Sequence, residues 1–216
     1  MKRKFFDGIK FIFWDFDGVI KDSVAVKGEA YMTVFEEFFN REIALQVRDF
    51  HLKNGGMSRY EKIPTCLRSI CNVENEVLSI ELQERFAEIV VDKVCSADWV
   101  PGVLEFLERS FTQNLNFILS ATPHDELGTI LARLELLRFD GWGGSPTKKA
   151  ELGAKFLFDF GLTPNEGCFI GDSLVDYETA EQLGLPFVHR RGVGMPIEGS
   201  LMSLKDFCEL GVLDDE

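Results

Sequence analysis

The sequence predicts an α/β fold with a doubly wound parallel sheet, and three observations support this. Short unbroken apolar runs recur along the 216-residue chain, and such runs are typical of strands buried on both faces of a parallel sheet. Amphipathic helical segments lie between these runs, which is the alternation of a doubly wound, Rossmann-like sheet. One long stretch carries helical patterns only, which predicts a helical unit inserted into the α/β core.

Each expected element has a local basis. The expected strands are 11–14, 117–119, 168–170 and, more weakly, 186–188. The expected helices of the core are 103–111, 124–137 and 148–160. Pro101, Pro123 and Gly161 mark helix boundaries, and Thr122 is a candidate N-cap. Apolar residues beyond Gly199 are sufficient for one further docked helix.

The stretch without strand patterns predicts the domain organisation. We expect residues 22–97 to form a helical cap domain, and 1–21 together with 98–216 to form the α/β core. The hinges are expected at 22–24 and 95–100. Insertions after a strand at the carboxyl edge of a sheet tend to lie over the ligand site, so this unit is expected to act as a lid.

Composition and charge exclude several classes of function. The chain is 45% hydrophobic and 27% charged, which is ordinary globular usage, so a disordered or fibrous protein is excluded. The net charge of −13 argues against non-specific binding to nucleic acid or to an anionic membrane. The N-terminal apolar run is too short for a signal peptide, and the five cysteines lack paired spacing, so we expect a cytoplasmic protein. The oligomeric state is left open.

Polar residues follow three of the expected strands directly. Asp15 and Asp17 follow the first strand, Ser120 follows the second, and Asp172 and Asp176 follow the third. In a doubly wound sheet the carboxyl ends of the strands meet at the ligand site, so we expect these side chains to converge. Clustered carboxylates repel one another, and a hard divalent cation relieves the conflict. Oxygen ligands without His or Cys indicate Mg²⁺ as the cofactor.

The motif after the first strand is the most specific signal. It has the form D-x-D-G-x-x-x-D-S, beginning at Asp15. Asp15 and Asp17 are two residues apart and would face the same side of a strand, which suits a nucleophile and a general acid/base. Gly18 permits a tight departure from the sheet. A plain strand-end turn is the alternative for a shorter D-x-D-G sequence.

With these motifs the chain resembles the haloacid dehalogenase-like hydrolase superfamily, most of whose members are Mg²⁺-dependent phosphatases. The resemblance runs from Phe11 to about Val188. It implies that Asp15 attacks phosphorus and forms an aspartyl-phosphate. It also implies that Asp17 is the general acid/base and offers its backbone carbonyl to the metal. A helical insertion after the first motif matches the small cap of the phosphoglycolate phosphatase-like branch.

The resemblance assigns the remaining motifs as well. Ser120, in FILSATP, would bind the transferring phosphoryl group. The phosphate-binding lysine lies in GSPTKKAEL, where the common Lys-x-Glu arrangement favours Lys149 over Lys148. In GDSLVD, Asp172 would be a direct metal ligand and Asp176 its supporting neighbour. Taken singly, each of these residues could instead be a helix cap or part of a solvated helix start.

Substrate contacts are expected from both the core and the cap. Gly18 and Ala121 would line the core side of the substrate site. The cap segment HLKNGGMSRY resembles the substrate-contacting loop of phosphoglycolate phosphatase-like members, which makes Asn54, Ser58 and Arg59 specificity candidates. Arg59 would bind a carboxylate or a second phosphate. The alternative is a helix–helix turn with a solvated Arg59.

The leading interpretation is therefore a Mg²⁺-dependent phosphomonoesterase acting on a phosphoglycolate- or sugar-phosphate-like metabolite. A phosphotransferase similar to β-phosphoglucomutase is the nearest alternative, because it shares the first motif. Dehalogenation is disfavoured because those relatives lack the carboxylate that Asp17 supplies. Phosphonate cleavage would need a lid lysine that forms a Schiff base, for which Lys53 is a candidate. A non-catalytic phosphate-binding module is a further alternative.

Overall fold

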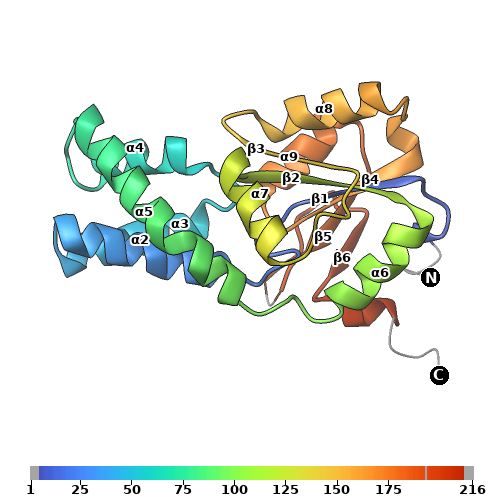
Figure 1. The fold of residues 1–216 in the computed structure, drawn as a ribbon, viewed down its shortest axis with the longest axis horizontal. Coiled ribbons are helices and arrows are strands. Elements are labelled where there is room, and N and C mark those ends of the chain that lie inside the picture. The colour runs from blue at the N-terminus through green and yellow to red at the C-terminus, as the bar shows by residue number, and fades with distance from the viewer. Residues whose placement is uncertain (1–4, 193, 212–216) are drawn as a thin grey trace.

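A computed structural model describes residues 5–192 and 194–211, and a parallel six-stranded sheet forms its core. The strand order is β3-β2-β1-β4-β5-β6, so the chain winds outward in both directions from β1 (Figure 1). The strands are β1 (Phe11–Trp14), β2 (Leu115–Pro123), β3 (Gly141–Ser145), β4 (Gly167–Gly171), β5 (Phe187–Arg190) and β6 (Met202–Leu204).

Helices cover both faces of the sheet. The core helices are α6 (Val103–Gln113), α7 (His124–Arg133), α8 (Lys149–Asp159) and α9 (Leu174–Leu183). Ile12 and Trp14 of β1 point to the side of α6 and α7 and pack in the larger apolar cluster. Phe11 and Phe13 point the other way and pack with residues of α8 and α9. Because alternate residues of one strand are buried on opposite sides, the predicted doubly wound α/β fold is confirmed.

A purely helical segment projects from the carboxyl edge of the sheet (Figure 1, left). It contains α2 (Val24–Phe38), α3 (Arg41–Lys53), α4 (Arg59–Ser69) and α5 (Glu76–Ser96). The two chain crossings that connect it to the core lie side by side. The backbone N–H of Asp22 donates to Asp98 O (2.8 Å), and that of Val100 donates to Ile20 O (3.0 Å). The expected absence of strands between 22 and 97 agrees with the described structure, while the division into two domains stays a prediction.

Several elements differ from the sequence expectations. Strand β3 was not expected, because its sequence GWGGS lacks an apolar run. Its glycines are needed for close packing, since a Cβ at Gly143 would lie 2.6 Å from Leu152 Cδ2. Helix α7 ends at Arg133 rather than near residue 137. The expected C-terminal helix was also wrong, because the tail forms the short strand β6 and a single 3₁₀ turn at Phe207–Leu210.

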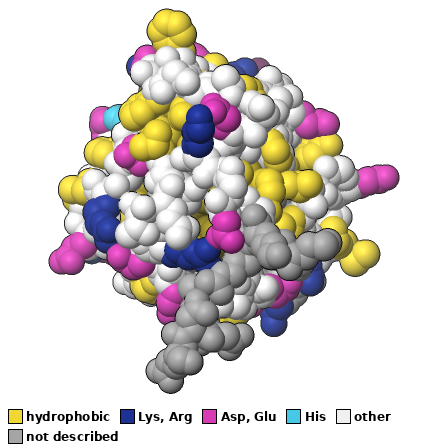
Figure 2. Space-filling view, turned by 90° about the vertical axis from the view of Figure 1, so that its right-hand side faces the viewer, with side chains coloured by type: hydrophobic (Ala, Val, Ile, Leu, Met, Phe, Trp, Pro, Cys, Tyr) yellow, Lys and Arg dark blue, Asp and Glu magenta, His cyan; other side chains and the backbone are white. Residues whose placement is uncertain are grey.

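The surface of the core away from α2–α5 carries charges of both signs. Figure 2 shows Lys and Arg side chains interspersed with Asp, Glu and hydrophobic side chains on this face. Within residues 5–192 and 194–211, no helix combines the length and apolar character required to cross a membrane.

Candidate active site

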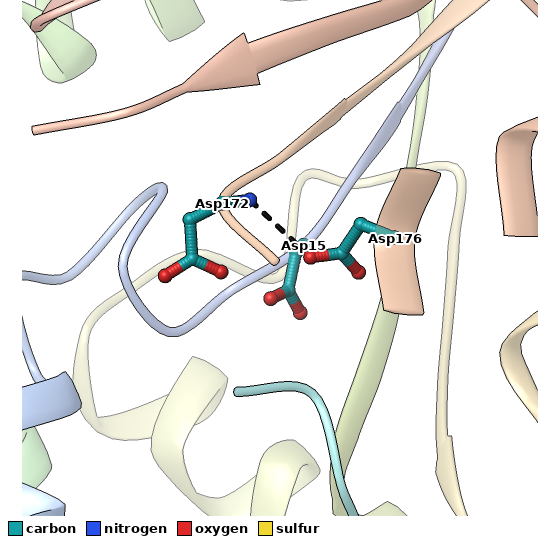
Figure 3. A group of neighbouring side chains, drawn as sticks. All are labelled: Asp15, Asp172 and Asp176. Carbon is teal, nitrogen blue, oxygen red and sulfur yellow. Dashed lines mark hydrogen bonds between the residues drawn. The ribbon is translucent and has the colours of Figure 1, made fainter. Parts of the chain in front are cut away.

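The carboxyl ends of β1 and β4 bring three aspartates together. Asp15 directly follows β1, and its backbone N–H donates to Ile170 O of β4 (2.9 Å). Asp172 and Asp176 follow β4. One carboxylate oxygen from each aspartate lies within 4.8 Å of the others, and Asp15 lies between the other two in Figure 3. The strand order reverses between β1 and β4, which is where doubly wound sheets bind ligands.

Asp176 is held rigidly by the start of α9. Its Oδ2 accepts hydrogen bonds from the Ser173 hydroxyl (2.7 Å) and from the backbone N–H groups of Ser173 (3.1 Å) and Asp172 (3.2 Å). Ser173 is the N-cap and Asp176 completes a capping box, so the cap residue is Ser173 rather than either aspartate alone. Asp176 is fully buried. It is therefore a supporting carboxylate that fixes the local backbone.

Lys149, the first residue of α8, lies between two of the aspartates. Its Nζ is 2.7 Å from Asp15 Oδ1 and 2.6 Å from Asp176 Oδ1. Burial opposes the charge of Lys149, but the adjacent carboxylates raise its pKa. Burial raises the pKa of Asp15 to about 7, with Asp176 adding to the shift and Lys149 opposing it. Lys148 is exposed, so the structure brings Lys149 and not Lys148 into the cluster.

The cluster fits a divalent cation. Burial, together with Asp15 and Asp176, raises the pKa of Asp172 well above its ordinary value. No described residue donates a hydrogen bond to the Asp172 carboxylate. Among the described residues, the three carboxylates, of which those of Asp15 and Asp176 are buried, have one ammonium partner, Lys149. The atoms available to bind a metal ion are all oxygen, which is the ligand type of Mg²⁺. Asp15 and Asp172 would hold the ion, together with the backbone carbonyl of Asp17 that the resemblance implies.

Comparisons with known proteins establish the fold of the chain. No protein-family model and no curated protein matches the chain. Among solved structures, a haloacid dehalogenase-like family hydrolase from Streptococcus pneumoniae matches with a TM-score of 0.75 and 19% identity, covering 94% of this chain and 97% of that one. The chain has the fold of the haloacid dehalogenase-like hydrolases. A predicted phosphoglycolate phosphatase from Haemophilus somnus has a TM-score of 0.76 at 17% identity, covering 94% and 96% of the two chains.

A second type of enzyme shares this haloacid dehalogenase-like fold. A putative β-phosphoglucomutase from Thermotoga maritima matches with a TM-score of 0.68 and 20% identity, covering 95% of this chain and 99% of that one. At these identities the similarity shows the fold. The activity has to be argued from the side chains of the site.

Gly18 is required at its position for two reasons. Its φ of +79° is in the left-handed region, and a Cβ there would lie 2.1 Å from Asp172 Oδ2. The close approach of Gly18 to Asp172, which lies in the GDSLVD motif, thus depends on the absence of a side chain at residue 18.

We expect Gly18→Ala to weaken Mg²⁺ binding by roughly 10- to 100-fold, the range found when a residue that positions a ligand is changed. The added methyl group must displace Asp172. Gly161→Ala is the matched control, because Gly161 has φ +62° and nothing within 4 Å of its Cβ position. The control should lose roughly 1–2 kcal/mol of stability from backbone strain alone. Thermal melts over a range of Mg²⁺ concentrations measure both effects. Equal Mg²⁺ affinity in the two variants would refute the role assigned to Gly18.

Asp17 faces the helical segment rather than the aspartate cluster. Its Oδ2 accepts from Lys27 Nζ (2.5 Å) and from Thr122 Oγ1 (3.0 Å), and its Oδ1 accepts from Ser23 (2.6 Å). Burial raises its pKa, but these three partners outweigh burial and lower it. The sequence indicates Thr122 as the N-cap of α7, and this prediction is wrong. Pro123 occupies that position, and the Thr122 hydroxyl donates to Asp17 instead.

Ser120 lies at the carboxyl end of β2. Its hydroxyl accepts a hydrogen bond from the Thr122 backbone N–H (3.1 Å). Ser120, Ala121 and Lys149 line one hollow of about 270 Å³ beside the cluster. The predicted phosphoryl-binding residues of the second and third motifs are therefore brought together.

A smaller cavity lies between the core and the helical segment. Its volume is about 60 Å³. Its core wall includes Asp15, Asp17, Ala121, Thr122 and Asp172, and its other wall includes Lys27, Tyr31, His51, Arg59, Lys62 and Phe86. The cavity thus places basic side chains of the helices opposite the aspartates of the core.

The predicted cap residues have different positions. Asn54 ends α3, and its side chain donates to Phe50 O (2.8 Å), while the cavity is lined by the residues that follow it. Ser58 is the N-cap of α4 and lines the hollow beside Ser120. Arg59 is only 6% exposed, so the alternative of a solvated Arg59 is wrong. Its guanidinium pairs with Glu126 of α7 and lies 4.9 Å from the centre of the Phe86 ring.

Sequence reasoning missed Lys27, His51 and Lys62. Lys62 is 2% exposed, and burial lowers its pKa to about 8. It lies three residues after Arg59, on the same side of α4, and this spacing was a usable signal. His51 belongs to the last turn of α3 rather than to the loop, and burial lowers its pKa to about 3.

We expect Lys62→Met to stabilise the protein. The lowering of the Lys62 pKa from 10.5 to about 8 corresponds to roughly 3 kcal/mol of unfolding free energy. Below pH 8, Lys62 is charged in both the folded and the unfolded state, so the full free-energy cost of burying its charge destabilises the wild type. Between pH 8 and 10.5 the folded state loses the proton first, so the advantage of the variant should shrink. Urea unfolding at several pH values tests this. The exposed Lys53→Met is the control, expected within about 0.5 kcal/mol. If the difference in unfolding free energy between Lys62→Met and the wild type did not change with pH, the assigned burial cost of Lys62 would be contradicted.

Proposed function

We propose that this protein is a Mg²⁺-dependent phosphomonoesterase that hydrolyses a small phosphorylated metabolite through an aspartyl-phosphate on Asp15. The observation that carries the proposal is the environment of the Asp15 carboxylate. One of its oxygens contacts Lys149, while the other has no hydrogen-bond partner among the described residues. The Asp15 carboxylate also belongs to the cluster that it forms with Asp172 and Asp176. A buried carboxylate with one free oxygen next to a cation-binding cluster is suited to nucleophilic attack on phosphorus.

Asp15 performs the first step. Its free oxygen attacks phosphorus, a P–O bond to Asp15 forms, and the ester P–O bond to the leaving group breaks. When bound, Mg²⁺ supplies positive charge that offsets the repulsion between the phosphate and the buried carboxylates. Lys149 and the Ser120 hydroxyl, which line one hollow, contact the oxygens of the transferring group.

Asp17 is the general acid/base of both steps. Lys27 Nζ donates to Asp17 Oδ2, 2.5 Å away, and the leaving alkoxide takes this proton through Asp17, which leaves Lys27 neutral. In the second step the Asp17 carboxylate accepts a proton from water and passes it back to Lys27, and the water oxygen attacks phosphorus. The acyl-phosphate bond then breaks, and Asp15 returns as a carboxylate with inorganic phosphate released. The lowered pKa of Asp17 favours the ionised form that this step needs.

The size of the cavity supports a small substrate. About 60 Å³ accommodates a compact group beside the aspartates, whereas sites for large ligands occupy several hundred Å³. The predicted phosphoglycolate phosphatase of similar fold is consistent with a substrate of this size.

We further propose that residues 22–97 form a cap domain over the core made of 1–21 and 98–216. The paired chain crossings at Asp22 and Asp98 support this boundary. The ion pair between Arg59 and Glu126 joins α4 to α7 across it.

The reducing cytoplasm is the compartment that we propose. The five cysteines of the chain form no disulfide, which fits a compartment where thiols stay reduced.

A mutase of the β-phosphoglucomutase type remains the second candidate, because the Thermotoga maritima protein shares the fold over nearly the whole chain. It would return the phosphoryl group from Asp15 to the substrate. The two reactions differ in product, since a phosphatase releases one phosphate for each substrate consumed, whereas a mutase yields an isomeric sugar phosphate.

Phosphonate cleavage is not favoured. Lys53, the lysine considered for Schiff-base chemistry, is exposed at the end of α3 and does not line the cavity. Borohydride with phosphonoacetaldehyde should therefore leave Lys53 unmodified.

The test of the proposed function is phosphate release from a panel of phosphorylated metabolites, with Mg²⁺ and with EDTA. We expect release that depends on Mg²⁺. Consumption of a sugar phosphate with an isomer formed and no phosphate released would favour the mutase. Absence of any turnover, together with binding of inorganic phosphate, would instead indicate a non-catalytic module.

A further inference from the structure

Lys62 is a buried ammonium without an acidic partner. It extends from α4 into the wall of the cavity and is 2% exposed. Among the residues that the structure describes, no carboxylate lies within ion-pair distance of its Nζ. The two other cations of this wall are neutralised, because Lys27 pairs with Asp17 and Arg59 pairs with Glu126. A buried charge without a counter-charge is costly, and such positions persist where a ligand supplies the charge.

His51 orients Lys62 without compensating its charge. The Nδ1 atom of His51 lies 2.9 Å from Lys62 Nζ, and Nε2 lies 3.0 Å from Val24 O. A carbonyl oxygen can only accept, so Nε2 carries the hydrogen and Nδ1 accepts from the ammonium. The ring is therefore neutral. Among the described residues, His51 is the only hydrogen-bond partner of the Lys62 ammonium, which also lies 5.6 Å from the centre of the Tyr31 ring. Two of its three N–H groups are therefore left to donate to a ligand.

The sequence had assigned recognition of a second anionic group to Arg59. In the structure the charge of Arg59 is compensated by Glu126, whose side chain is 9% exposed. Lys62, one helical turn further along α4, is the cation of the cavity wall that is left uncompensated.

We propose that Lys62, positioned by His51, binds a carboxylate of the substrate, so that the enzyme prefers small phosphorylated acids over neutral phosphate esters. This rests on the proposed phosphatase function. Two N–H groups match the two oxygens of a carboxylate, and one positive charge matches its single negative charge. Asp15 and Asp172 lie on the opposite wall of the same cavity, so the phosphoryl group and the carboxylate would occupy its two sides.

The test compares three phosphate esters of a two-carbon group. These are 2-phosphoglycolate with a carboxylate, ethyl phosphate with no second charged group, and ethylene glycol bisphosphate with a second phosphate. We expect wild-type kcat/KM to be roughly 10- to 100-fold higher for 2-phosphoglycolate than for ethyl phosphate, the effect of a charge-assisted hydrogen bond. Lys62→Met should reduce this ratio to below about 3 by lowering the value for 2-phosphoglycolate alone. Lys62→Gln is a second variant that retains N–H donors without the charge. Lys53→Met, an exposed lysine of the same segment, is the matched control and should keep the wild-type ratio.

A binding measurement separates this proposal from the proposed function. Calorimetry with 2-phosphoglycolate on Asp15→Asn, alone and combined with Lys62→Met, requires no turnover. We expect the added Lys62→Met change to weaken binding roughly 10-fold or more. An unchanged discrimination ratio or an unchanged affinity would overturn the role of Lys62. A preference for the bisphosphate that disappears in Lys62→Met would overturn the carboxylate and assign a second phosphate to this site. Failure of the wild type to hydrolyse any compound, with Lys62-dependent binding retained, would reject the phosphatase and leave the anion site standing.

Discussion

Asp15→Asn is expected to lower Mg²⁺-dependent phosphate release by roughly 10⁴-fold or more, the scale seen when a nucleophile is removed. Asparagine has nearly the same shape as aspartate, but its amide oxygen does not form the covalent intermediate. Removing one of three crowded carboxylates should also leave the fold intact or stabilise it, because burial already raises the pKa of Asp15 to about 7. Initial-rate measurements on the best compound of the panel, with a thermal melt of each protein, test both points.

Asp49→Asn is the control for this substitution. Asp49 is an exposed aspartate on α3 outside both the cavity and the cluster. The rate of phosphate release by Asp49→Asn should therefore stay within about twofold of the wild-type rate. An Asp15→Asn protein that retains a substantial fraction of the activity would mean that another group attacks phosphorus.

Lys149→Met is expected to impair both stability and activity. Lys149 is 5% exposed and contacts Asp15 and Asp176. Without it, the buried carboxylates of Asp15 and Asp176 lack their only cation partner among the described residues, which should cost roughly 3–5 kcal/mol of unfolding free energy in the absence of metal. The loss should be greater at pH 8 than at pH 5, because the raised pKa of Asp15 allows it to become protonated as the pH falls. Activity should fall at least about 100-fold with the loss of a contact to the phosphoryl oxygens.

Added Mg²⁺ gives this prediction a sharper readout. Because the cation partly replaces the missing charge, Mg²⁺ should raise the melting temperature of Lys149→Met more than that of the wild type. Lys148→Met is the matched control, since Lys148 is the preceding residue and is exposed. If the two variants behave alike in stability and rate, Lys149 is not part of the site.

The strands that carry the motifs were predictable from sequence. Phe11–Trp14 and Cys168–Ile170 are unbroken apolar runs. Asp15 follows the first run directly, and Asp172 follows the second after one glycine. Because the carboxyl ends of parallel strands lie at the same edge of a doubly wound sheet, the order of these runs was sufficient to predict that Asp15 and Asp172 lie close together. The choice of Lys149 over Lys148 rested on a family pattern, and the structure places Lys149 between two of the aspartates.

Other features depended on tertiary contacts that no local pattern reports. Strand β3 has a glycine-rich sequence because Leu152 packs directly against it. Thr122 looked like a helix cap, but its hydroxyl donates to Asp17, 105 residues earlier in the chain. The exposed or buried state of a lysine is likewise set by folding. The spacing of Lys62 from Arg59 indicates a shared helix face, but no local pattern shows that Lys62 enters the cavity while Lys53 does not.

The most direct test of the central claim is to trap the phosphoryl group on Asp15. The protein is mixed with ³²P-labelled acetyl phosphate, a small phosphoryl donor, in the presence of Mg²⁺ and quenched in acid within milliseconds. We predict a label that is released by hydroxylamine, as expected for an acyl phosphate, and that maps to the peptide containing Asp15. The same experiment on Asp15→Asn should give no label. Turnover of acetyl phosphate with no label, or with a label on another residue, would contradict phosphoryl transfer to Asp15.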